Sequence, residues 1–460
     1  MAQLSVKIEL AAPLLAGTWK PNTNVLETLG YLPGAALRGA LVDALTSDWT
    51  PERKKAPHPE QCPDRKTCSL CRVLFPLEAA EPRFGDCYPA LADDEPQALP
   101  ATARTCKRYP GFLRPEDPEG GHGIFDALIR QAAFESAVND SDRPLPYLYE
   151  PHCQVCGEGV DAPPVAHYAR FDENTFYSAS AVEQRLSRTA INRARWAAQD
   201  EQLYTLSLLS EKMSTGLISK HGGRIEYVQS VTILKGTVRV ADGREETMKV
   251  ALQSMRWVGA GRSRGLGECN VTAKVVPEVN NRLEGLGDFA AQAEANKFER
   301  PETTNTLIGR LQEFNRLLQS ERAFWMQLGV PVLPGQWYFS VDLLADAILR
   351  DNGAPTLQLT PEMIGITGDG KPLVKHTLSA VNRTYRSGWS GAKGLPRPVK
   401  LAAARGGVYL FAVEAGDATT MRKLVERLAE LEAEGIGEER ERGCGRLIIC
   451  APFHLEVEPR

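Results

Sequence analysis

The sequence predicts an α+β protein in which one β-α-β-β-α-β unit occurs twice, the first copy carrying a large irregular insertion. Two observations lead to this prediction. A helical pattern, a glycine-rich loop and a strand follow one another in both halves of the chain, and seven of the ten cysteines gather in a segment without periodicity. Internal repetition marks repeated structural units, so it is the strongest organisational signal in the chain.

The bulk composition is that of a globular protein with more than one domain. The 460 residues exceed what a single core of typical size holds. The net charge is −4, so a nucleic-acid site has to be a local patch. No apolar run approaches the ~18 residues of a membrane helix, and the N-terminus lacks the basic region of a signal peptide. We therefore expect a cytoplasmic protein with no membrane contact, whose cysteines are thiols or metal ligands.

The first unit begins with the strand-like stretch "LSVKIELAAPLLAG". Pro33 and Gly34 end the segment before a helix predicted over 36–45. An irregular insertion fills residues 50 to about 164, and regular structure resumes after it. The stretch "DGREETMKVALQSMRWVG" then places apolar residues on one helical face, before a glycine loop and the strand "CNVTAKVVPEV". These apolar residues are Met248, Ala251, Leu252, Met255 and Val258.

The second unit opens near Trp337 with "QWYFSVDLLADAI" and repeats the helix, loop and strand at its end. Its helix presents Met421, Leu424, Val425, Leu428 and Leu431 on one face, and "RLIICAPFHLEVE" supplies the strand. We expect a first domain over 1–279, a charged helical linker over 280–333 and a second domain over 334–460.

The two glycine loops share the pattern R-x-R-G-x-G, at Arg262 to Gly267 and at Arg440 to Gly445. They lack the Lys and Ser/Thr of a P-loop, and they join a helix to a following strand, the reverse of the nucleotide-binding order. A loop entering the last strand of a β-α-β-β-α-β unit suits the ferredoxin-like (RRM-like) fold. There, arginines and backbone amides can hold the phosphates of an RNA strand. A solvated β-turn is the alternative interpretation of each loop. The predicted RNA-binding residues here are Gly259, Gly261, Arg262, Ser263, Arg264, Gly265, Gly267, Arg440 and Arg442.

At these loops and at four further motifs, the chain resembles the RAMP superfamily of CRISPR effector proteins. "GYLPGAALRGAL" resembles the first-helix motif of that family, "RFGDCYPAL" its next strand, and "LSRTAINRARWAAQDEQLYTLSLL" a segment in which arginines precede a strand. "NRTYRSGWSGAKGLPRPVKLAAARGGVYLF" resembles the two-domain subunit of type III-D effectors, which is grouped with the proteins that cap the 5′ end of the guide RNA. The resemblance covers most of the chain.

The resemblance implies a non-catalytic RNA-binding subunit of a type III CRISPR ribonucleoprotein, one that serves antiviral defence and holds the 5′ handle of the guide RNA (crRNA). The implied partners are the guide RNA, its target RNA, other RAMP subunits and the large polymerase-type subunit. Further RNA-binding residues that it implies are Arg38, Arg188, Asn192, Arg193, Arg383, Arg386 and Trp389. The arginines at 185, 188, 193 and 195 are equally compatible with the outer face of a helix.

The cysteines of the insertion predict structural zinc. "HPEQCPDRKTCSLC" holds His58, Cys62, Cys68 and Cys71, a set that completes a closed tetrahedral shell. A second pair, Cys153 and Cys156, takes Cys106 and either His122 or His152 as its partners. The alternatives are one four-thiolate site made of Cys68, Cys71, Cys153 and Cys156, or free thiols without metal. We expect Cys87, Cys269, Cys444 and Cys450 to be small packing residues.

The sequence offers weak support for catalysis. His221 and His376 are the best candidates for a general acid or base, but neither has a partner evident in the sequence. RAMP subunits that cut target RNA resemble one another in an aspartate before the first helix, and the corresponding stretch "GTWKPNTNVLETLG" has none. We interpret Asp126 as structural. The alternatives are a metal-independent guide-processing endoribonuclease with His221 as its catalytic residue, and a target-RNA-cleaving backbone subunit.

Overall fold

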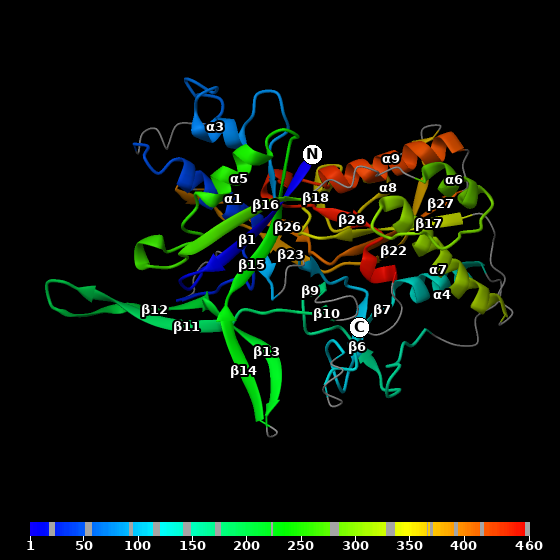
Figure 1. The fold of residues 1–460 in the computed structure, drawn as a ribbon, viewed down its shortest axis with the longest axis horizontal. Coiled ribbons are helices and arrows are strands. Elements are labelled where there is room, and N and C mark those ends of the chain that lie inside the picture. The colour runs from blue at the N-terminus through cyan, green and yellow to red at the C-terminus, as the bar shows by residue number, and fades with distance from the viewer. Residues whose placement is uncertain are drawn as a thin grey trace.

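The computed structural model combines strands and helices, so the predicted α+β class is confirmed (Figure 1). It describes residues 1–17, 24–50, 58–91, 95–113, 120–140, 149–170, 176–221, 224–276, 285–327, 336–365, 367–368, 371–390, 394–414 and 418–455. Within these ranges, no helix has the length and hydropathy needed to cross a membrane.

The first unit is an antiparallel sheet covered by two helices. The strand order is β16 (Cys269–Val276), β1 (Ala2–Leu10), β15 (Ile233–Val240) and β3 (Arg83–Phe84), and β4 (Tyr88–Pro89) also pairs with β15. The helices are α1 (Gly34–Leu45) and α5 (Glu245–Gln253). Alternate residues of β1 are buried, as expected for a strand with one face on the core. That core joins Leu4, Val6, Ile8, Leu37, Leu41, Met248 and Leu252.

The second unit repeats this strand order. Its antiparallel sheet runs β22 (Val374–Ala380), β27 (Val408–Glu414), β17 (Gln336–Leu343) and β28 (Leu447–Ile449). In both sheets the last strand pairs with the first, the first with the third, and the third with the second. The helix before the last strand is α9 (Ala418–Glu434). The short α8 (Pro361–Ile364) lies between the first and second strands of the sheet in chain order, as α1 does in the first unit. All five apolar residues predicted to line one face of α9 are buried.

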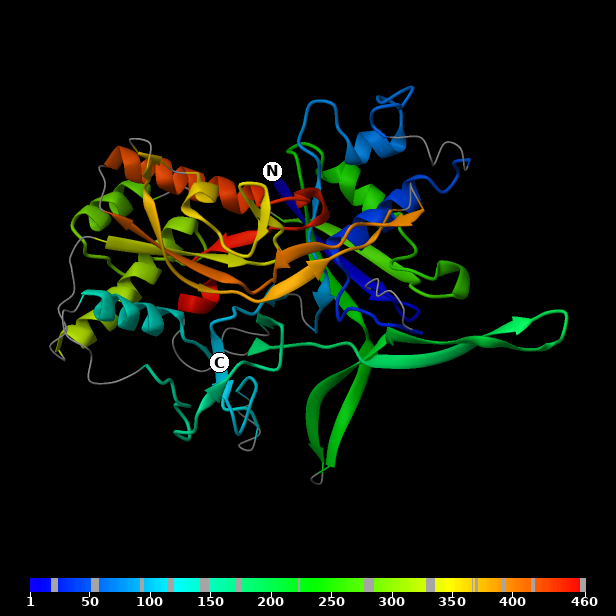
Figure 2. The ribbon, with the colours of Figure 1, turned by 180° about the vertical axis from the view of Figure 1, so that it is seen from behind.

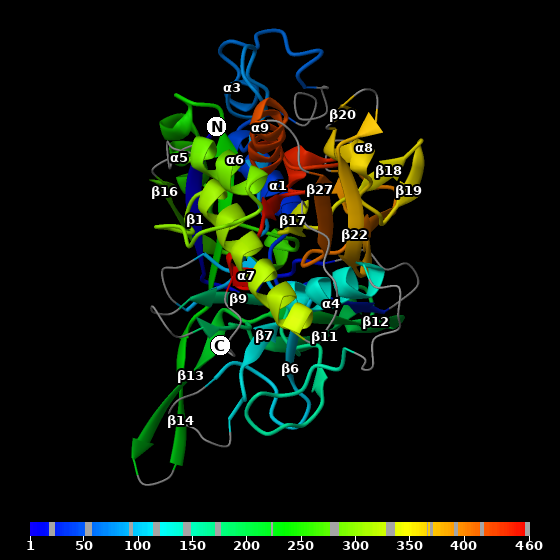
Figure 3. The same ribbon diagram turned by 90° about the vertical axis from the view of Figure 1, so that its right-hand side faces the viewer.

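Helices from outside the second unit complete its core. Helices α6 (Leu286–Glu294) and α7 (Leu307–Gln327) pack there, and so does α4 (Leu128–Asp140) from the insertion. The three lie together at one end of the molecule (Figure 3). The segment predicted as a linker thus supplies buried residues such as Phe289 and Phe314 to the second core. The predicted boundaries at 279/280 and 333/334 lie outside the described residues.

The insertion is made of short elements. The helix α3 (Ser69–Leu74) packs on the first unit, where Leu70 and Leu74 join its core. One small sheet runs β7 (Ile124–Asp126), β6 (Ala103–Cys106) and β8 (Val160–Asp161). Another runs β10 (Phe176–Tyr177), β9 (His167–Arg170) and β5 (Gln97–Ala98). This lack of long periodic elements matches the irregular sequence.

Two long hairpins project from the first unit (Figures 1 and 2). The first pairs β11 (Glu183–Asn192) with β12 (Ala197–Leu209), beside the short β2 (Val25–Leu26). The second pairs β13 (Lys212–His221) with β14 (Arg224–Val231). The alternative that Arg185, Arg188, Arg193 and Arg195 share the outer face of a helix is therefore wrong. The strands pair through a turn at 193–196, and this pairing over long range overrides the spacing of the arginines.

Short ribbons extend the second unit. The pair β18 (Leu349–Asp351) and β19 (Ala354–Thr356) follows β17, and β20 (Thr367–Gly368) pairs with β21 (Lys371–Pro372). The pair β23 (Arg383–Arg386) and β26 (Lys400–Ala403) leads to β24 (Trp389–Ser390) and β25 (Leu395–Pro396). In the chain, β23 to β26 follow β22 and precede β27, and together they form one extended ribbon.

A buried polar cluster joins the two units. Asp86 of the first unit accepts a hydrogen bond from the backbone N–H of Gly34 at 2.8 Å, and Asp346 of the second accepts one from the N–H of Arg405 at 2.9 Å. The guanidinium of Arg386 lies between the two carboxylates, 3.3 Å from Asp346 and 4.0 Å from Asp86. Arg405 stacks on the ring of Tyr31 at 3.9 Å. Because a buried charge is tolerated only with partners, this cluster fixes how the units meet.

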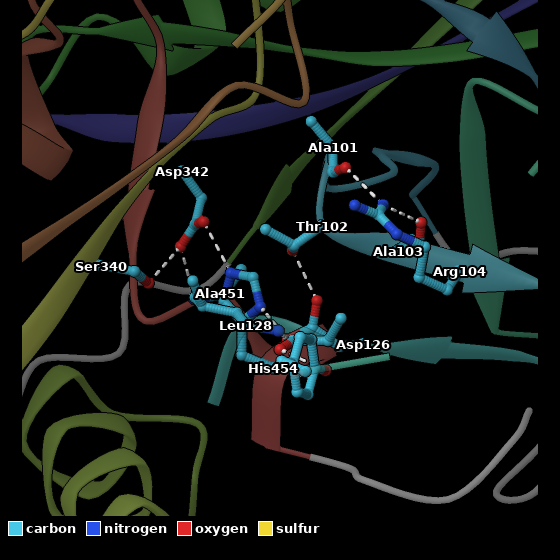
Figure 4. Close-up of polar contacts among 12 residues, drawn as sticks. Ala101, Thr102, Ala103, Arg104, Asp126, Leu128, Ser340, Asp342, Ala451 and His454 are labelled. Carbon is cyan, nitrogen blue, oxygen red and sulfur yellow. Dashed lines mark hydrogen bonds and ion pairs between the residues drawn. The ribbon is translucent and has the colours of Figure 1, made fainter. Parts of the chain in front are cut away.

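A second buried cluster ties the insertion to the C-terminal end of the second unit (Figure 4). His454, in the short 3₁₀ helix η3 (Pro452–Leu455), donates from Nδ1 to Asp126 at 2.8 Å and from Nε2 to Asp342 at 2.7 Å. Thr102 and Ser340 donate their hydroxyls to the same two carboxylates at 2.5 and 2.7 Å. Burial alone would lower the pKa of His454, but the carboxylates of Asp342 and Asp126 outweigh it and raise that pKa to about 10. The imidazole is therefore a buried cation.

We predict that His454→Ala destabilises the protein by roughly 3–5 kcal/mol, because it leaves two buried carboxylates without their cation. The pKa is raised on folding, so the stabilising contribution is complete below about pH 6.5 and is lost as the pH rises toward about 10. Urea unfolding across that range should show the wild type losing stability relative to the variant. A difference between the two proteins that does not change with pH would contradict the buried cation.

Candidate metal centres and nucleic-acid interface

The first cysteine cluster forms as the sequence predicts. His58, Cys62, Cys68 and Cys71 each bring one ligand atom to a common point, and these atoms all lie within 4.8 Å of one another. The Nδ1 atom of His58 is 3.2 Å from the sulfur of Cys71 and 3.9 Å from that of Cys68. Cys68 precedes helix α3 and accepts a hydrogen bond from the N–H of Cys71. The start of this helix therefore sets the Cys-x-x-Cys geometry.

The second cluster resolves the choice that the sequence left open. Cys106, His122, Cys153 and Cys156 meet, again with ligand atoms within 4.8 Å. The sulfurs of Cys106 and Cys156 are 3.6 Å apart, and that of Cys153 is 3.5 Å from Nδ1 of His122. His152 is exposed and contacts the carbonyl of Glu150, so it is not the fourth member. Because the thiols divide between two clusters, the alternative of one four-thiolate site is wrong.

Both clusters have the dimensions of a tetrahedral metal shell. Zinc–sulfur bonds of about 2.3 Å place neighbouring sulfurs of a tetrahedron about 3.8 Å apart, and a nitrogen ligand shortens that edge slightly. The separations above are close to these values, whereas a disulfide needs about 2.05 Å. Four donors close the shell and leave no position for a substrate. Three thiolates and one imidazole can therefore hold a metal ion in a structural role.

The first glycine loop exposes its arginines. Residues 262–264 form the 3₁₀ turn η1 (Arg262–Arg264), flanked by Gly261 and Gly265 with φ of 84° and 75°. A Cβ at Gly267 would overlap the carbonyl oxygen of Val258, so only glycine allows this close return of the chain. Arg262 is more than half exposed and pairs with Asp43 at 2.6 Å, an interaction that solvent screens. Arg264 lies 5.5 Å from the ring of Tyr204.

This loop adjoins the base of the first hairpin. Leu266 of the loop packs with Leu206 and Leu208 of β12, and Arg264 contacts Tyr204 of the same strand. The structure thus brings together two of the predicted RNA-binding regions. Within the hairpin, Arg193 is exposed and Arg188 is half-buried. Asn192 has a local role, because its side-chain oxygen accepts hydrogen bonds from the N–H groups of Ala194 and Arg195.

The sequence analysis missed the most exposed aromatic residue in this region. Trp196 lies in the turn of the first hairpin with 90% of its surface exposed and a φ of 53°. Ile191 and Leu203 nearby are also exposed, at 67% and 61%. The stretch "NRARW", a tryptophan among arginines in a polar context, was the available signal. Such a tip presents a flat ring and positive charge together.

The second glycine loop lies in the contact between the units. Its 3₁₀ turn is η2 (Arg440–Arg442), and a Cβ at Gly443 would overlap the carbonyl oxygen of Phe84 in the first unit. Arg442 is paired with Glu439 at 3.0 Å and Glu441 at 3.4 Å, and Arg440 with Glu434 at 3.4 Å. The same sequence pattern thus serves packing in one unit and exposure in the other.

Arg38, Arg440 and Arg442 nevertheless meet. They line a cavity of about 530 Å³ together with Arg83, Glu81, Glu441, His58 and Phe75. Burial lowers the pKa of Arg38 and raises the pKa of Glu81. The glutamates at 434, 439 and 441 already pair with Arg440 and Arg442, so these two arginines add little free positive charge to the cavity.

The other predicted RNA-binding residues of the second unit are partly exposed and partly buried. Arg383 is exposed and Trp389 has 60% of its surface exposed, so both are open to a ligand. Arg386 instead lies in the buried cluster with Asp86 and Asp346 and has only 13% of its side chain exposed. The burial of Arg386 does not suit the RNA-binding role predicted for it, and its carboxylate partners are too distant in sequence to have been predicted.

The candidate catalytic histidines gain little support. His376 lies in β22 against the ring of Phe411, and burial lowers its pKa. The side chain of His221 lies outside the described residues, although its backbone pairs with Arg224 at the end of the second hairpin. Asp126, interpreted from the sequence as structural, is held by Thr102 and His454.

Comparison with known proteins identifies the C-terminal part. Residues 333–452 match the family model described as CRISPR-associated protein (Cas_Cmr3). This part of the chain is therefore similar to the CRISPR-associated proteins, in agreement with the resemblance to CRISPR effector proteins that the sequence predicts. No curated protein matches the sequence.

Among solved structures, a chain of the type III-B Cmr-beta complex bound to cognate target RNA and AMPPnP aligns with a TM-score of 0.36 and 10% identity, over 88% of this chain and 86% of the other. A chain of the type III-B Cmr-beta apo state aligns with a TM-score of 0.27 and 11% identity, over 60% of this chain and 98% of the other. A chain of a type IV-B CRISPR complex aligns with a TM-score of 0.23 and 10% identity, over 60% of this chain and 91% of the other. TM-scores this low do not establish a common fold.

We predict up to two metal ions per chain, one in each cluster, and independent loss of each. Cys68→Ser should remove the ion of the first cluster and loosen α3, since metal binding contributes folding free energy. Cys106→Ser should remove only the other ion. Elemental analysis of protein purified without chelator measures both, with Cys269→Ala, a buried cysteine outside the clusters, as the control. Metal-free protein in which every cluster thiol reacts freely would contradict the prediction.

Proposed function

We propose that this chain is a non-catalytic guide-RNA-binding subunit of a type III CRISPR effector ribonucleoprotein, and that it holds the 5′ handle of the guide. The family match at 333–452 supports the class of protein. The observation that carries RNA binding is the first glycine loop, where Arg262 and Arg264 stand exposed on a turn of glycines. The partners proposed with it are the guide RNA, its target RNA, other RAMP subunits and the large polymerase-type subunit.

We interpret the two units as ferredoxin-like domains. The shared strand order and the all-antiparallel pairing of both sheets support this interpretation. The helix before the last strand is present in both units as α5 and α9. The proposed domains are 1–279, with the insertion at about 50–164, and 334–460, and the helices of 280–333 pack on the second.

The chemistry of the loop suits a sugar-phosphate backbone. A guanidinium can give paired hydrogen bonds to phosphate oxygens, and the glycines bear no side chains that keep a ligand away. The salt bridge from Arg262 to Asp43 is solvent-exposed, so a phosphate competes for that arginine at small cost. The neighbouring hairpin adds Arg193 and the ring of Trp196. Phosphate contacts of this kind position an RNA without reading its sequence.

Zinc is the metal that we propose for the two Cys₃His clusters. Thiolate and imidazole ligands in a closed tetrahedral shell are the structural zinc combination. The segment that holds the ligands has few long elements, so the ions would stabilise a fold that its small core supports poorly.

The alternative function is that of a metal-independent endoribonuclease that matures the guide. Among the described residues, the half-buried His376 packs against Phe411, an arrangement that favours a structural histidine. A target-RNA-cleaving subunit remains the third candidate, and the missing aspartate before α1 disfavours it.

We predict that Arg262→Ala/Arg264→Ala weakens guide-RNA binding for all sequences alike. Each lost phosphate contact should flatten the salt dependence of the logarithm of affinity by about 0.7, the value for single strands. The measurement is guide-RNA affinity across a salt series. Arg422→Ala/Lys423→Ala is the matched control, because it removes two cations from the exposed side of α9. An unchanged affinity and slope in the folded loop variant would show that the glycines form only a turn.

We predict that His221→Ala and His376→Ala leave assembly and guide maturation intact, because neither histidine has a catalytic partner evident in the sequence. Incubation of wild type and variants with a repeat-containing transcript tests this. Shortening of the transcript by the wild type and its loss in either variant would assign the endoribonuclease function instead.

A further inference from the structure

One stretch of the chain is free of acidic residues over an unusual length. Between Asp369 and Glu414 there is no Asp or Glu, but there are eight Lys and Arg residues. In the whole chain acidic residues outnumber basic ones, 58 to 54. Arg386 is buried beside Asp346, Arg405 stacks on Tyr31, and Lys400 pairs with Glu438 and Glu439. The remaining cations, which include Arg383 and Arg397, have no carboxylate near them in the sequence, and this is the electrostatic pattern of a nucleic-acid contact.

The middle of this segment is the ribbon formed by β23 to β26. In Figure 2 its orange strands leave the second sheet and run toward the blue elements of the first unit. Arg386 points inward and anchors the ribbon, contacting Tyr31 and Asp346 at 3.3 Å each. Because successive side chains of a strand point to opposite faces, Arg383 and Tyr385 point outward.

The outward face combines aromatic rings with cations. Tyr385 and Trp389 each have 60% of their surface exposed, and Leu395 beside them has 59%. Arg383 is exposed, and Arg397 donates to the carbonyl oxygen of Trp389 at 3.5 Å. The pairing of Trp389 with Pro396 holds the indole on a short two-stranded turn. Large aromatic residues exposed together on paired strands are unusual for a surface that binds nothing.

We propose that the outward face of this ribbon, with Tyr385 and Trp389 at its centre, is a stacking platform for unpaired bases of single-stranded RNA. Aromatic rings bind bases of any sequence through their π faces, while adjacent arginines hold the phosphates. The proposal rests on the proposed function only in taking RNA as the ligand. It assigns a surface separate from the glycine loop, on the other unit of the chain.

Charge decides between RNA and a protein partner. A protein-binding surface also favours Trp, Tyr and Arg, but it is depleted of Lys as well as of Asp and Glu, whereas this segment lacks only the carboxylates and keeps four lysines.

The test compares single-stranded and duplex RNA on the full chain. A short uridine homopolymer and a duplex with the same number of phosphates are the probes. Trp389→Ala should weaken binding of the homopolymer about tenfold and leave duplex binding unchanged, with the salt slope preserved. Trp389→Phe should retain most of the affinity, whereas Trp389→Leu, which keeps the apolar volume, should not. Phe324→Ala removes an aromatic side chain of similar exposure, 54%, on α7 and serves as the control.

Measuring the loop variant Arg262→Ala/Arg264→Ala alongside distinguishes a failure of this inference from a failure of the proposed function. Loss of homopolymer affinity in Trp389→Ala and Trp389→Leu but not in Trp389→Phe supports the platform. Equal affinity in all ribbon variants, with loss in the loop variant, overturns the platform and leaves the proposed function intact. If the wild type binds neither probe, both fail. If the ribbon variants bind RNA normally but lose a copurifying protein subunit, the surface is a protein contact and the platform is overturned.

Discussion

The arrangement of the two units depends on a buried guanidinium shared between two carboxylates. Arg386 comes from the second unit and reaches Asp86 of the first, while Asp346 and Tyr31 complete its surroundings. Desolvating these charges is costly unless each keeps its partner, so sliding one unit against the other would break the cluster. The second glycine loop adds a steric constraint, because only glycine at 443 allows the backbone to approach Phe84. The position of every surface that spans the two units follows from this contact.

The insertion is attached to both units by different means. Near the first unit, Leu70 and Leu74 of α3 enter the core directly behind the cluster of His58, Cys62, Cys68 and Cys71. At the second unit, α4 enters the core and His454 holds Asp126 at the end of β7. The sheet that contains β7 also contains β6, whose last residue is Cys106 of the second cluster. Each Cys₃His cluster is thus one short element away from a hydrophobic core, which explains how an irregular segment can be held in place.

Local patterns in the sequence predicted the local structure. The apolar spacing of α9 and the Cys-x-x-Cys pairs specify contacts within a few residues, and the structure contains both. The choice of His122 over His152 depended on where two distant segments meet, and the sequence left it open. Arg386 was predicted to bind RNA, because its carboxylate partners, 40 and 300 residues away, leave no nearby signal of its buried role. The same holds for His454, whose two carboxylates lie far from it in the chain, and for the hairpin of β11 and β12, which forms by pairing rather than by local propensity.

The duplicated loops show how one motif divides its roles between two units. In the first unit the loop has a free outer side, so its arginines face solvent beside the hairpin. In the second unit the equivalent turn is covered by Phe84, and glutamates at 434, 439 and 441 occupy its arginines. If the second unit is to contact RNA, its positive charge must be presented elsewhere. The only stretch of comparable length in this unit without carboxylates is the one that contains the ribbon of β23 to β26, and this ribbon is anchored at its base by the same Arg386 that joins the units. The contact between the units that packs Gly443 against Phe84 therefore also supports the ribbon, which presents positive charge where the paired arginines of the loop do not.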